Sequence, residues 1–456
     1  MKDPSGTHDQ AGESTATQPA KVKDPSRARV GVGLLGCGNV GAALVELLAE
    51  QRTIIAGRTG LELDVVRVAV RSASRSRKVA IADGVLTTDA AAVVRDPSVD
   101  VVVELIGGIE PARELVTTAL KLGKPVVTAN KELLANYGAE LYAAADTAGV
   151  DLLFEAAVGG GIPLIRPLRA SLAAEPIRRV MGIVNGTTNY ILSRMTEEGT
   201  SYQDALASAQ SLGYAERDPT ADVEGFDAAA KAAIIATVAF GARVLAGNVY
   251  REGISDIGPT NIAHAGRLGY VVKLLAIVEQ VGRVEGKPEL AVRVHPAMLP
   301  VDHPLASVRD SFNAVFVEGG AVGELMLYGR GAGGRPTASA VLGDLIDAAG
   351  NRYRNTWNPI GDLGEAVIRP IDDLASEYCI DLEVLDRPGV LAAVAGVFGH
   401  HGVSIRSMEQ EGLDDQARLV FITHRATERD VQATLTDLRE LEAVRGAPAL
   451  LRVINR

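Results

Sequence analysis

The feature that most constrains the fold of this chain is a glycine-rich loop between an apolar segment and a helix-like one. Residues 30–35 are continuously apolar, as in a buried strand, and residues 42–51 have the pattern of a helix. The loop between them contains Gly36, Gly38 and Gly41 in the spacing G-x-G-x-x-G. The first glycine permits a tight turn, the second lets the backbone approach a pyrophosphate, and the third lets helix and strand pack closely. The spacing predicts a dinucleotide site, and a turn without a ligand is the alternative.

Further strands and helices alternate after this loop. The strands are expected at 65–70, 100–106 and 125–128, with a helix at 111–122. Strands that are apolar on both faces suit a parallel sheet covered by helices. We therefore expect an α/β domain, a Rossmann-like doubly wound parallel sheet, over residues 29–150.

The remainder of the chain changes character twice. Residues 151–330 mix strands and helices and predict an α+β catalytic and dimerisation domain. Residues 331–375 begin with a glycine-rich loop and a helix that returns to the nucleotide domain, and continue as a linker. Residues 376–456 follow the order βαββαβ, which predicts a ferredoxin-like module. Residues 1–28 are polar and predict a disordered tail.

Composition excludes several classes of protein. The net charge of −11 over 456 residues argues against nucleic acid as a partner. The longest apolar run without charges, at 232–242, is too short to span a membrane. Cys37 and Cys379 lie far apart, so neither a disulfide framework nor a zinc cluster is expected. We expect a soluble, cytoplasmic protein.

The choice of cofactor depends on the end of the second predicted strand. Sites that prefer NAD usually carry an acidic residue there for the ribose 2′-hydroxyl. This chain has Arg71 at that position, followed by Arg75, Arg77 and Lys78. Cations at this place favour a 2′-phosphate and hence NADP. A solvated basic loop is the alternative.

Two lysines and a run of carboxylates are the candidate chemical groups. Lys131 follows the strand at 125–128, and ligands of open parallel sheets bind at that edge. Asp227 and Lys231 are four residues apart and share one face of a predicted helix. Burial and the helix N-terminus are expected to lower the pKa of Lys231, which suits it to move the proton that accompanies hydride transfer. An exposed ion pair and an ordinary surface lysine are the alternatives.

Seven motifs together resemble the homoserine dehydrogenase family over nearly the whole length from Arg29. They read GLLGCGNVG, TANKELLA, FEAAVGGGIPLI, GIVNGTTNYIL, GYAERDPTADVEGFDAAAK, HPLASV and GAGGRPTASAV. The segment Leu385–Leu391 resembles the start of an ACT domain, a module that often binds amino acids.

The resemblance implies interconversion of L-homoserine and L-aspartate 4-semialdehyde with NADP or NAD, on the route to threonine and methionine. By the same resemblance Lys231 is the acid–base residue and Lys131 lies between nicotinamide and substrate. The implied substrate-binding residues are Glu216, Asp222, Asp227, Gly186 and Thr187. The implied cofactor-binding residues are Gly36, Gly38, Asn39, Val40, Gly41, Arg71, Lys131 and Gly333.

The resemblance also implies a bound cation, an effector and an assembly. A structural sodium ion is expected at Glu155, Val158, Gly160 and Ile162, largely through backbone carbonyls. Threonine is the expected effector, bound near residues 386–390. Removal of the chain after residue 377 should then leave activity and abolish inhibition. The expected assembly is a homodimer or a homotetramer.

Two other functions remain open at this stage. One is another NADP-dependent amino-acid dehydrogenase that acts on a related semialdehyde or hydroxy acid. The other is a non-catalytic amino-acid sensor, against which the presence of both lysines argues. A fusion with an aspartokinase is not expected, because no kinase-sized region precedes Arg29.

Overall fold

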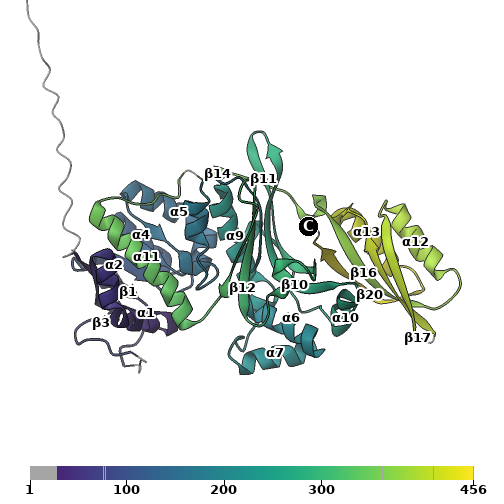
Figure 1. Cartoon of the computed structure of the whole chain (residues 1–456), viewed down its shortest axis with the longest axis horizontal. Helices are drawn as coiled ribbons and strands as arrows, with labels where there is room; N and C mark the ends of the chain where they lie inside the picture. Colours follow the sequence, from purple (N-terminus) through teal and green to yellow (C-terminus); the bar gives the residue numbers. More distant parts are fainter. Residues whose placement is uncertain (1–27, 75–76, 78, 362, 414, 455–456) are drawn as a thin grey trace, which may run out of the picture.

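A computed structural model of the chain describes residues 28–74, 77, 79–361, 363–413 and 415–454. The predicted tail lies outside these residues apart from Ala28, which already belongs to the first strand. The fold is elongated, with a nucleotide-type domain at one end, a middle domain, and a small domain at the other end (Figure 1). In the described part of the chain, no helix combines the length and the apolarity that a bilayer span requires.

The first domain is the predicted doubly wound parallel sheet. Its strand order is β3-β2-β1-β4-β5-β6, and every neighbouring pair is parallel. The strands are β1 Ala28–Leu35, β2 Leu61–Ala69, β3 Leu86–Thr87, β4 Val101–Glu104, β5 Val126–Thr128 and β6 Leu152–Leu153. The helices are α1 Asn39–Glu50, α2 Arg52–Thr59, α3 Ala90–Arg95, α4 Ala112–Lys121 and α5 Lys131–Ala148. The first helix begins three residues earlier than predicted, directly after Gly38.

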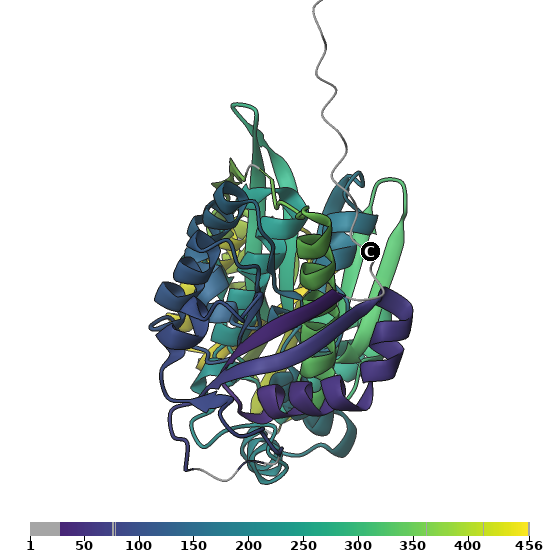
Figure 2. The ribbon, with the colours of Figure 1, turned by 90° about the vertical axis from the view of Figure 1, so that its left-hand side faces the viewer.

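A late helix completes this domain, as the sequence predicted. Helix α11 (Gly334–Arg354) packs along α1, and its apolar residues Val341 and Leu345 are buried in the core of the nucleotide domain. Figure 2 shows α11 beside the amino-terminal strands and helices. The sequence pattern predicts this helix over residues 338–349, and in the structure it is longer at both ends. It stops at Asn355, which adopts a left-handed conformation with φ of 54°.

The middle domain is an antiparallel sheet with helices packed against it. Its strand order is β13-β12-β7-β10-β11. The strands are β7 Ile177–Ile183, β10 Tyr270–Val284, β11 Lys287–Pro300, β12 Phe312–Gly319 and β13 Glu324–Arg330. The helices are α6 Gly186–Glu198, α7 Tyr202–Ser211, α8 Thr220–Val223, α9 Phe226–Phe240 and α10 Pro259–Arg267.

Helix α9 joins the middle domain to the nucleotide domain. It packs against β10 and β11 on one side and against α5 on another. Every residue from Asp227 to Thr237 is buried, because the helix has protein around it rather than a solvent face. The small alanine side chains let the neighbouring elements approach closely.

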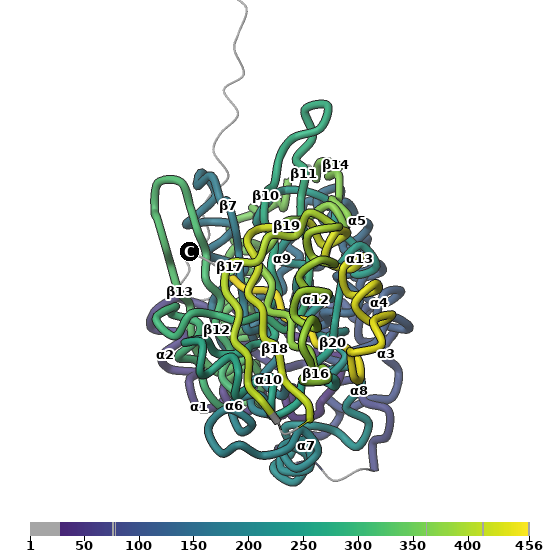
Figure 3. The backbone as a smooth tube through the Cα atoms, turned by 90° about the vertical axis from the view of Figure 1, so that its right-hand side faces the viewer, coloured from purple at the N-terminus to yellow at the C-terminus, as the bar shows by residue number. Residues whose placement is uncertain are grey.

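The last domain has the predicted order βαββαβ. Its elements are β16 Ala375–Leu385, α12 Val390–His400, β17 Ile405–Leu413, β18 Gln416–Thr423, α13 Glu428–Arg439 and β20 Val444–Val453. Helices α12 and α13 pack against each other over the strands (Figure 3). The sequence pattern predicts a final strand over residues 450–454, whereas β20 begins at Val444. It pairs with β16 on one side and with β11 on the other. The middle and last domains therefore share one sheet.

The linker is expected over residues 351–375, but only part of this segment is irregular. It contains the end of α11, the short strands β14 (Gly364–Glu365) and β15 (Val367–Ile368), and a short 3-10 helix. Strand β15 pairs in parallel with β11 at Leu290. Two residues are too few for a recognisable strand pattern, so the sequence did not indicate this strand.

A buried lysine holds a loop of the middle domain beside α6. The Lys273 ammonium on β10 donates to the Val308 carbonyl at 2.6 Å and to Asn189 Oδ1 at 3.0 Å. Asn189 in turn donates to the Asp310 carbonyl at 2.9 Å. These partners are neutral, so burial lowers the pKa of Lys273 to about 8.

This lysine makes stability depend on pH with a definite sign. Between about pH 8 and its ordinary pKa of 10.5, the unfolded chain holds the Lys273 proton and the folded chain does not. Raising the pH through this window therefore stabilises the fold. We expect the Tm of the wild type minus that of Lys273→Met to increase from about pH 8 to about pH 10. Lys287→Met, at an exposed position on β11, is the control, and parallel Tm profiles for Lys273→Met and wild type would contradict the assignment.

Candidate active site

The glycine-rich loop has the geometry that its spacing predicted. Gly36 has φ of 98°, and a Cβ there would lie 2.7 Å from the Leu105 carbonyl oxygen. A Cβ on Gly38 would meet no atom within 4 Å, so this backbone is open to a ligand. A Cβ on Gly41 would lie 2.4 Å from the Gly36 carbonyl oxygen, which keeps helix and strand close. Asn39 and Val40 form the first turn of α1, whose free N–H groups suit a phosphate.

A second helix N-terminus lies beside the first. Gly333 precedes α11 with φ of 120°, a conformation that favours glycine. A Cβ on Gly334 would lie 3.0 Å from the Asn39 carbonyl oxygen, so the starts of α1 and α11 are in close contact. Two helix N-termini at one place favour binding of an anionic group.

The basic residues after β2 lie close to this loop. Arg71 is exposed and follows the strand by two residues. Burial raises the pKa of the Cys37 thiol in the loop, and the nearby Arg77 guanidinium opposes that rise. Arg75 and Lys78 lie outside the described residues. The sequence expectation of cations at this place thus has a structural counterpart in Arg71 and Arg77.

Lys131 is placed by polar residues that sequence reasoning did not single out. Glu104, at the end of β4, is fully buried, and one oxygen accepts from the Ile106 and Gly107 backbone N–H groups at 2.7 and 3.0 Å. Its other oxygen accepts from the Thr128 hydroxyl at 2.6 Å, which joins the ends of β4 and β5. Asn130 then caps α5 and donates to the Gly108 carbonyl at 2.6 Å.

The centre of the site is one carboxylate shared by two lysines. Asp227 Oδ1 lies 2.6 Å from Lys131 Nζ, and Asp227 Oδ2 lies 2.6 Å from Lys231 Nζ. The Lys231 ammonium also donates to the Val184 carbonyl at 2.6 Å. The side chain of Lys231 is 11% exposed and that of Lys131 is 39% exposed, so Lys131 is the lysine that a ligand can reach more easily. Of the alternatives, the exposed ion pair is excluded.

Charges around this carboxylate shift the pKa values of its neighbours. Burial would raise the pKa of Asp227, but Lys231 and Lys131 hold it well below its ordinary value. Burial would lower the pKa of Lys131, and the Asp227 carboxylate outweighs burial and raises it. Asp227 is therefore ionised and Lys131 is a cation at neutral pH.

A second carboxylate joins the cluster through an asparagine. The Asn185 side-chain amide donates to Asp222 Oδ1 at 2.7 Å and to Asp227 Oδ2 at 3.0 Å, while its own oxygen caps α6. Burial raises the pKa of Asp222, and hydrogen bonds from Asn185 and Thr187 oppose the rise. Asn185 is a bridging residue that the sequence analysis missed, although it directly precedes the predicted Gly186.

The other predicted substrate residues differ in their placement. Thr187 is buried and donates to the Tyr214 carbonyl at 2.8 Å. Gly186 begins α6, and a Cβ there would lie 2.6 Å from the Ser311 carbonyl oxygen. Glu216 is exposed on the loop before α8, and among the described residues no hydrogen bond or ion pair links its carboxylate to the cluster. Its substrate-binding role stays a prediction.

The segment predicted to hold a cation, residues 155–162, contacts the glycine-rich loop that precedes α11. The Glu155 carboxylate accepts from the backbone N–H groups of Leu164, Ile165 and Arg166, so only its carbonyl could reach a cation. A Cβ on Gly160 would lie 2.3 Å from the Gly331 carbonyl oxygen. Within the described ranges the carbonyls of Val158, Gly160 and Ile162 accept no backbone hydrogen bond, and no three His, Cys, Asp or Glu side chains gather as a metal site. Carbonyls of this kind suit a hard monovalent cation.

The fold and this arrangement define the class of protein. The dinucleotide loop after β1 and Lys131 after β5 lie at the same edge of one parallel sheet, and α9 brings Asp227 and Lys231 to Lys131. A nucleotide site beside paired proton-transferring groups is characteristic of NAD(P)-dependent oxidoreductases.

Comparison with known proteins specifies the family. The profile of homoserine dehydrogenase matches residues 163–346, that of the homoserine dehydrogenase NAD-binding domain matches 36–155, and that of the ACT domain matches 380–443. The homoserine dehydrogenase of Corynebacterium glutamicum is 50% identical over 442 residues, which cover 94% of this chain and 97% of that protein. This chain belongs to the homoserine dehydrogenase family and is an NAD(P)-dependent oxidoreductase with an ACT domain.

Solved structures agree with this assignment. The crystal structure of a homoserine dehydrogenase from Thiobacillus denitrificans is 41% identical with a TM-score of 0.88, and covers 94% of this chain and 98% of that one. A hyperthermophilic archaeal homoserine dehydrogenase in complex with NADPH is 33% identical with a TM-score of 0.60. The latter match covers 70% of this chain and 97% of that one.

Proposed function

We propose that this enzyme interconverts L-homoserine and L-aspartate 4-semialdehyde in threonine and methionine biosynthesis, with Lys231 as the proton-transferring residue. The observation that carries this proposal is the Asp227 carboxylate shared by two lysines at the nucleotide edge of the sheet. When bound, the nicotinamide supplies or accepts the hydride. The chain's own residues must therefore bind the substrate and move one proton.

Lys231 moves that proton at the substrate oxygen. In the reductive direction its ammonium donates a proton to the developing alkoxide, and in the oxidative direction the neutral amine accepts the hydroxyl proton. Asp227 and the Val184 carbonyl fix the direction of its Nζ atom. Lys131 adds a positive charge beside the same oxygen, which stabilises negative charge in the transition state.

The cationic group of the substrate is bound by carboxylates. Asp222, held by Asn185, lies next to the lysine cluster and suits an α-ammonium group. Glu216 is proposed as a second carboxylate on the exposed loop. Gly186 and Thr187 form the start of α6 directly after Asn185, and we propose that they contact the substrate.

The role of Lys231 can be tested by two substitutions. Lys231→Ala should lower kcat by about two to four orders of magnitude, because proton transfer is lost. Lys231→Arg retains the positive charge beside Asp227 but does not release its proton at neutral pH, so it should be nearly as inactive. Steady-state kinetics measure both, and the Kd for NADPH should stay within about twofold because neither change touches the dinucleotide loop. A near-normal kcat in Lys231→Ala would contradict the role of Lys231 as the proton-transferring residue.

We propose NADP as the preferred cofactor, because Arg71 follows the end of β2, where the ribose is expected, and Arg77 lies near Cys37 of the glycine-rich loop. Arg71→Ser should raise the KM for NADPH about tenfold and leave the KM for NADH unchanged. Arg95→Ser is the matched control, since Arg95 is an exposed arginine in the last turn of α3, at the opposite edge of the sheet. An equal rise in the KM for NADPH and the KM for NADH would contradict a contact between Arg71 and the 2′-phosphate.

A sodium ion is proposed as a structural cofactor in the loop from Glu155 to Ile162. The backbone carbonyls of Glu155, Val158, Gly160 and Ile162 would hold it. This segment contacts Gly331, and Gly334 in turn contacts Asn39 at the start of α1. A cation in the segment would therefore rigidify the two helix N-termini at which the dinucleotide is expected to bind.

Threonine is proposed as an inhibitor that binds the ACT domain at the turn between β16 and α12. This turn is exposed from Asp386 to Gly389, and Gly389 has φ of 91°.

Self-association through the middle domain is proposed because β13, at the edge of the shared sheet, leaves Tyr328 54% exposed.

The effector site is best tested in the full-length chain. Strand β20 belongs to the sheet of both domains, so deletion after residue 377 would remove a strand next to β11 and is not a clean experiment. We expect L-threonine to inhibit the wild type, and Asp386→Ala to abolish inhibition without changing uninhibited activity. Glu440→Ala, at the end of α13, should remain sensitive. If the wild type is insensitive to threonine, the domain serves assembly only.

A further inference from the structure

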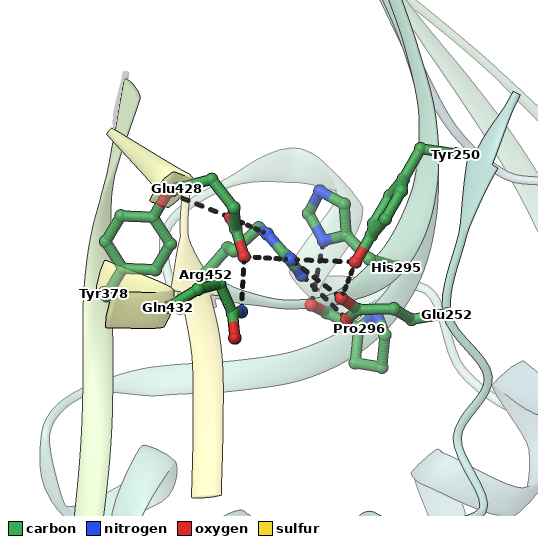
Figure 4. Close-up of polar contacts among 8 residues, drawn as sticks. All are labelled: Tyr250, Glu252, His295, Pro296, Tyr378, Glu428, Gln432 and Arg452. Atoms are coloured by element: carbon green, nitrogen blue, oxygen red, sulfur yellow. Dashed lines mark hydrogen bonds and ion pairs between the residues drawn. The ribbon is translucent and has the colours of Figure 1, made fainter. Parts of the chain in front are cut away.

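A buried arginine at the end of the chain connects the ACT domain to the middle domain (Figure 4). Arg452 on β20 is 2% exposed. Its Nη1 and Nη2 atoms each donate to one oxygen of Glu252 at 2.7 Å, and its Nε and Nη2 atoms donate to Glu428 at 2.8 and 2.7 Å. One guanidinium therefore binds a carboxylate of the middle domain and a carboxylate of α13, in the paired geometry that makes arginine contacts specific.

Glu252 is fixed at both its side chain and its backbone. It follows the short strand β9 (Tyr250–Arg251), which pairs in parallel with β11. Its backbone N–H donates to the Val294 carbonyl at 2.8 Å, and its carboxylate also accepts from the Tyr250 hydroxyl. Burial would raise the pKa of Glu252, but Arg452 lowers it to about 2.

The residues after Glu252 support the turn that carries the substrate carboxylates. The Ile254 backbone N–H donates to the Val223 carbonyl at 2.8 Å. A Cβ on Gly253 would lie 2.5 Å from that carbonyl oxygen, so the two segments are in tight contact. A Cβ on Gly225 would lie 3.2 Å from the Glu252 carbonyl oxygen.

This turn lies between the two carboxylates of the site. Asp222 precedes Val223, and Asp227 follows Gly225 by two residues at the start of α9. Gly225 has φ of 78°, and its N–H donates to the Asp222 carbonyl at 3.1 Å. A displacement of the turn would therefore move Asp222 relative to Asp227.

We propose that Arg452 is a positioning residue for homoserine binding, which acts through Glu252 on the turn between Asp222 and Asp227. The proposal rests on the substrate-binding role proposed above for these two carboxylates. Without the arginine, the half-buried Glu252 and the buried Glu428 would face each other as like charges, and the segment from Tyr250 to Ile254 would have to move. Asp222 is the proposed partner of the substrate ammonium group, and hydrogen bonds weaken steeply when their geometry is disturbed, so its displacement would weaken binding of homoserine.

Glu252→Gln is the first test, because it retains the shape of the side chain and replaces one acceptor oxygen by a donor that opposes Arg452. We expect the KM for L-homoserine to rise about five- to tenfold, while kcat and the KM for NADP stay within about twofold. Arg452→Met should give the same change, and Arg452→Lys should recover part of it. The double variant Glu252→Gln/Arg452→Met should be no worse than either single variant, because both break one interaction.

Arg429→Met is the matched control, since Arg429 is another arginine of the ACT domain and pairs with Asp373 at 2.6 Å, outside this path. Its KM for L-homoserine should equal that of the wild type. A KM for Glu252→Gln within twofold of the wild type, or an equal rise in the control, would overturn the proposal. Thermal unfolding shows whether Arg452→Met is folded. If it is not, the KM of Glu252→Gln alone tests the proposal. Normal activity of Lys231→Ala would instead overturn the proposed function, so the two failures are distinguishable.

Discussion

The sharing of Asp227 between Lys131 and Lys231 is the interaction on which the candidate active site depends. Lys131 comes from the nucleotide domain, whereas Asp227 and Lys231 come from α9 of the middle domain. Buried charges are tolerated only when they are paired, so this contact fixes the two domains at one relative position. The Lys131 cation at this carboxylate suits a substrate oxygen that becomes negative during the proposed reaction.

The rest of the fold serves to keep these groups in place. Helix α9 can carry a buried ion pair because small apolar residues on its other faces pack against α5 and the antiparallel sheet. The Glu104 carboxylate ties the ends of β4 and β5 together, and Asn130 then directs the start of α5. On the opposite side, β20 extends the middle sheet into the ACT domain. The ACT domain is thereby built into the scaffold of the middle domain.

The pattern of residues predicted the parts of the site that are local in sequence. The spacing of Gly36, Gly38 and Gly41 predicted the loop geometry, and the separation of Asp227 and Lys231 predicted their contact on one helix face. Glu104 and Asn185 were missed, because a single carboxylate after a strand and an asparagine before a helix are common in any protein. Their importance lies in partners 24 and 37 residues away.

The sequence by itself determined the alternation of strands and helices in the nucleotide domain, the nucleotide loop, the ACT-like order of the last domain and the membership of the family. Periodicity and glycine spacing act over a few residues, so they can be recognised without knowledge of the fold. Only the tertiary structure decided that Lys131 shares a carboxylate with Lys231, that β20 joins two domains, and that Arg452 binds Glu252 across 200 residues of chain. These contacts depend on how sheets and helices pack in space, which no local pattern encodes.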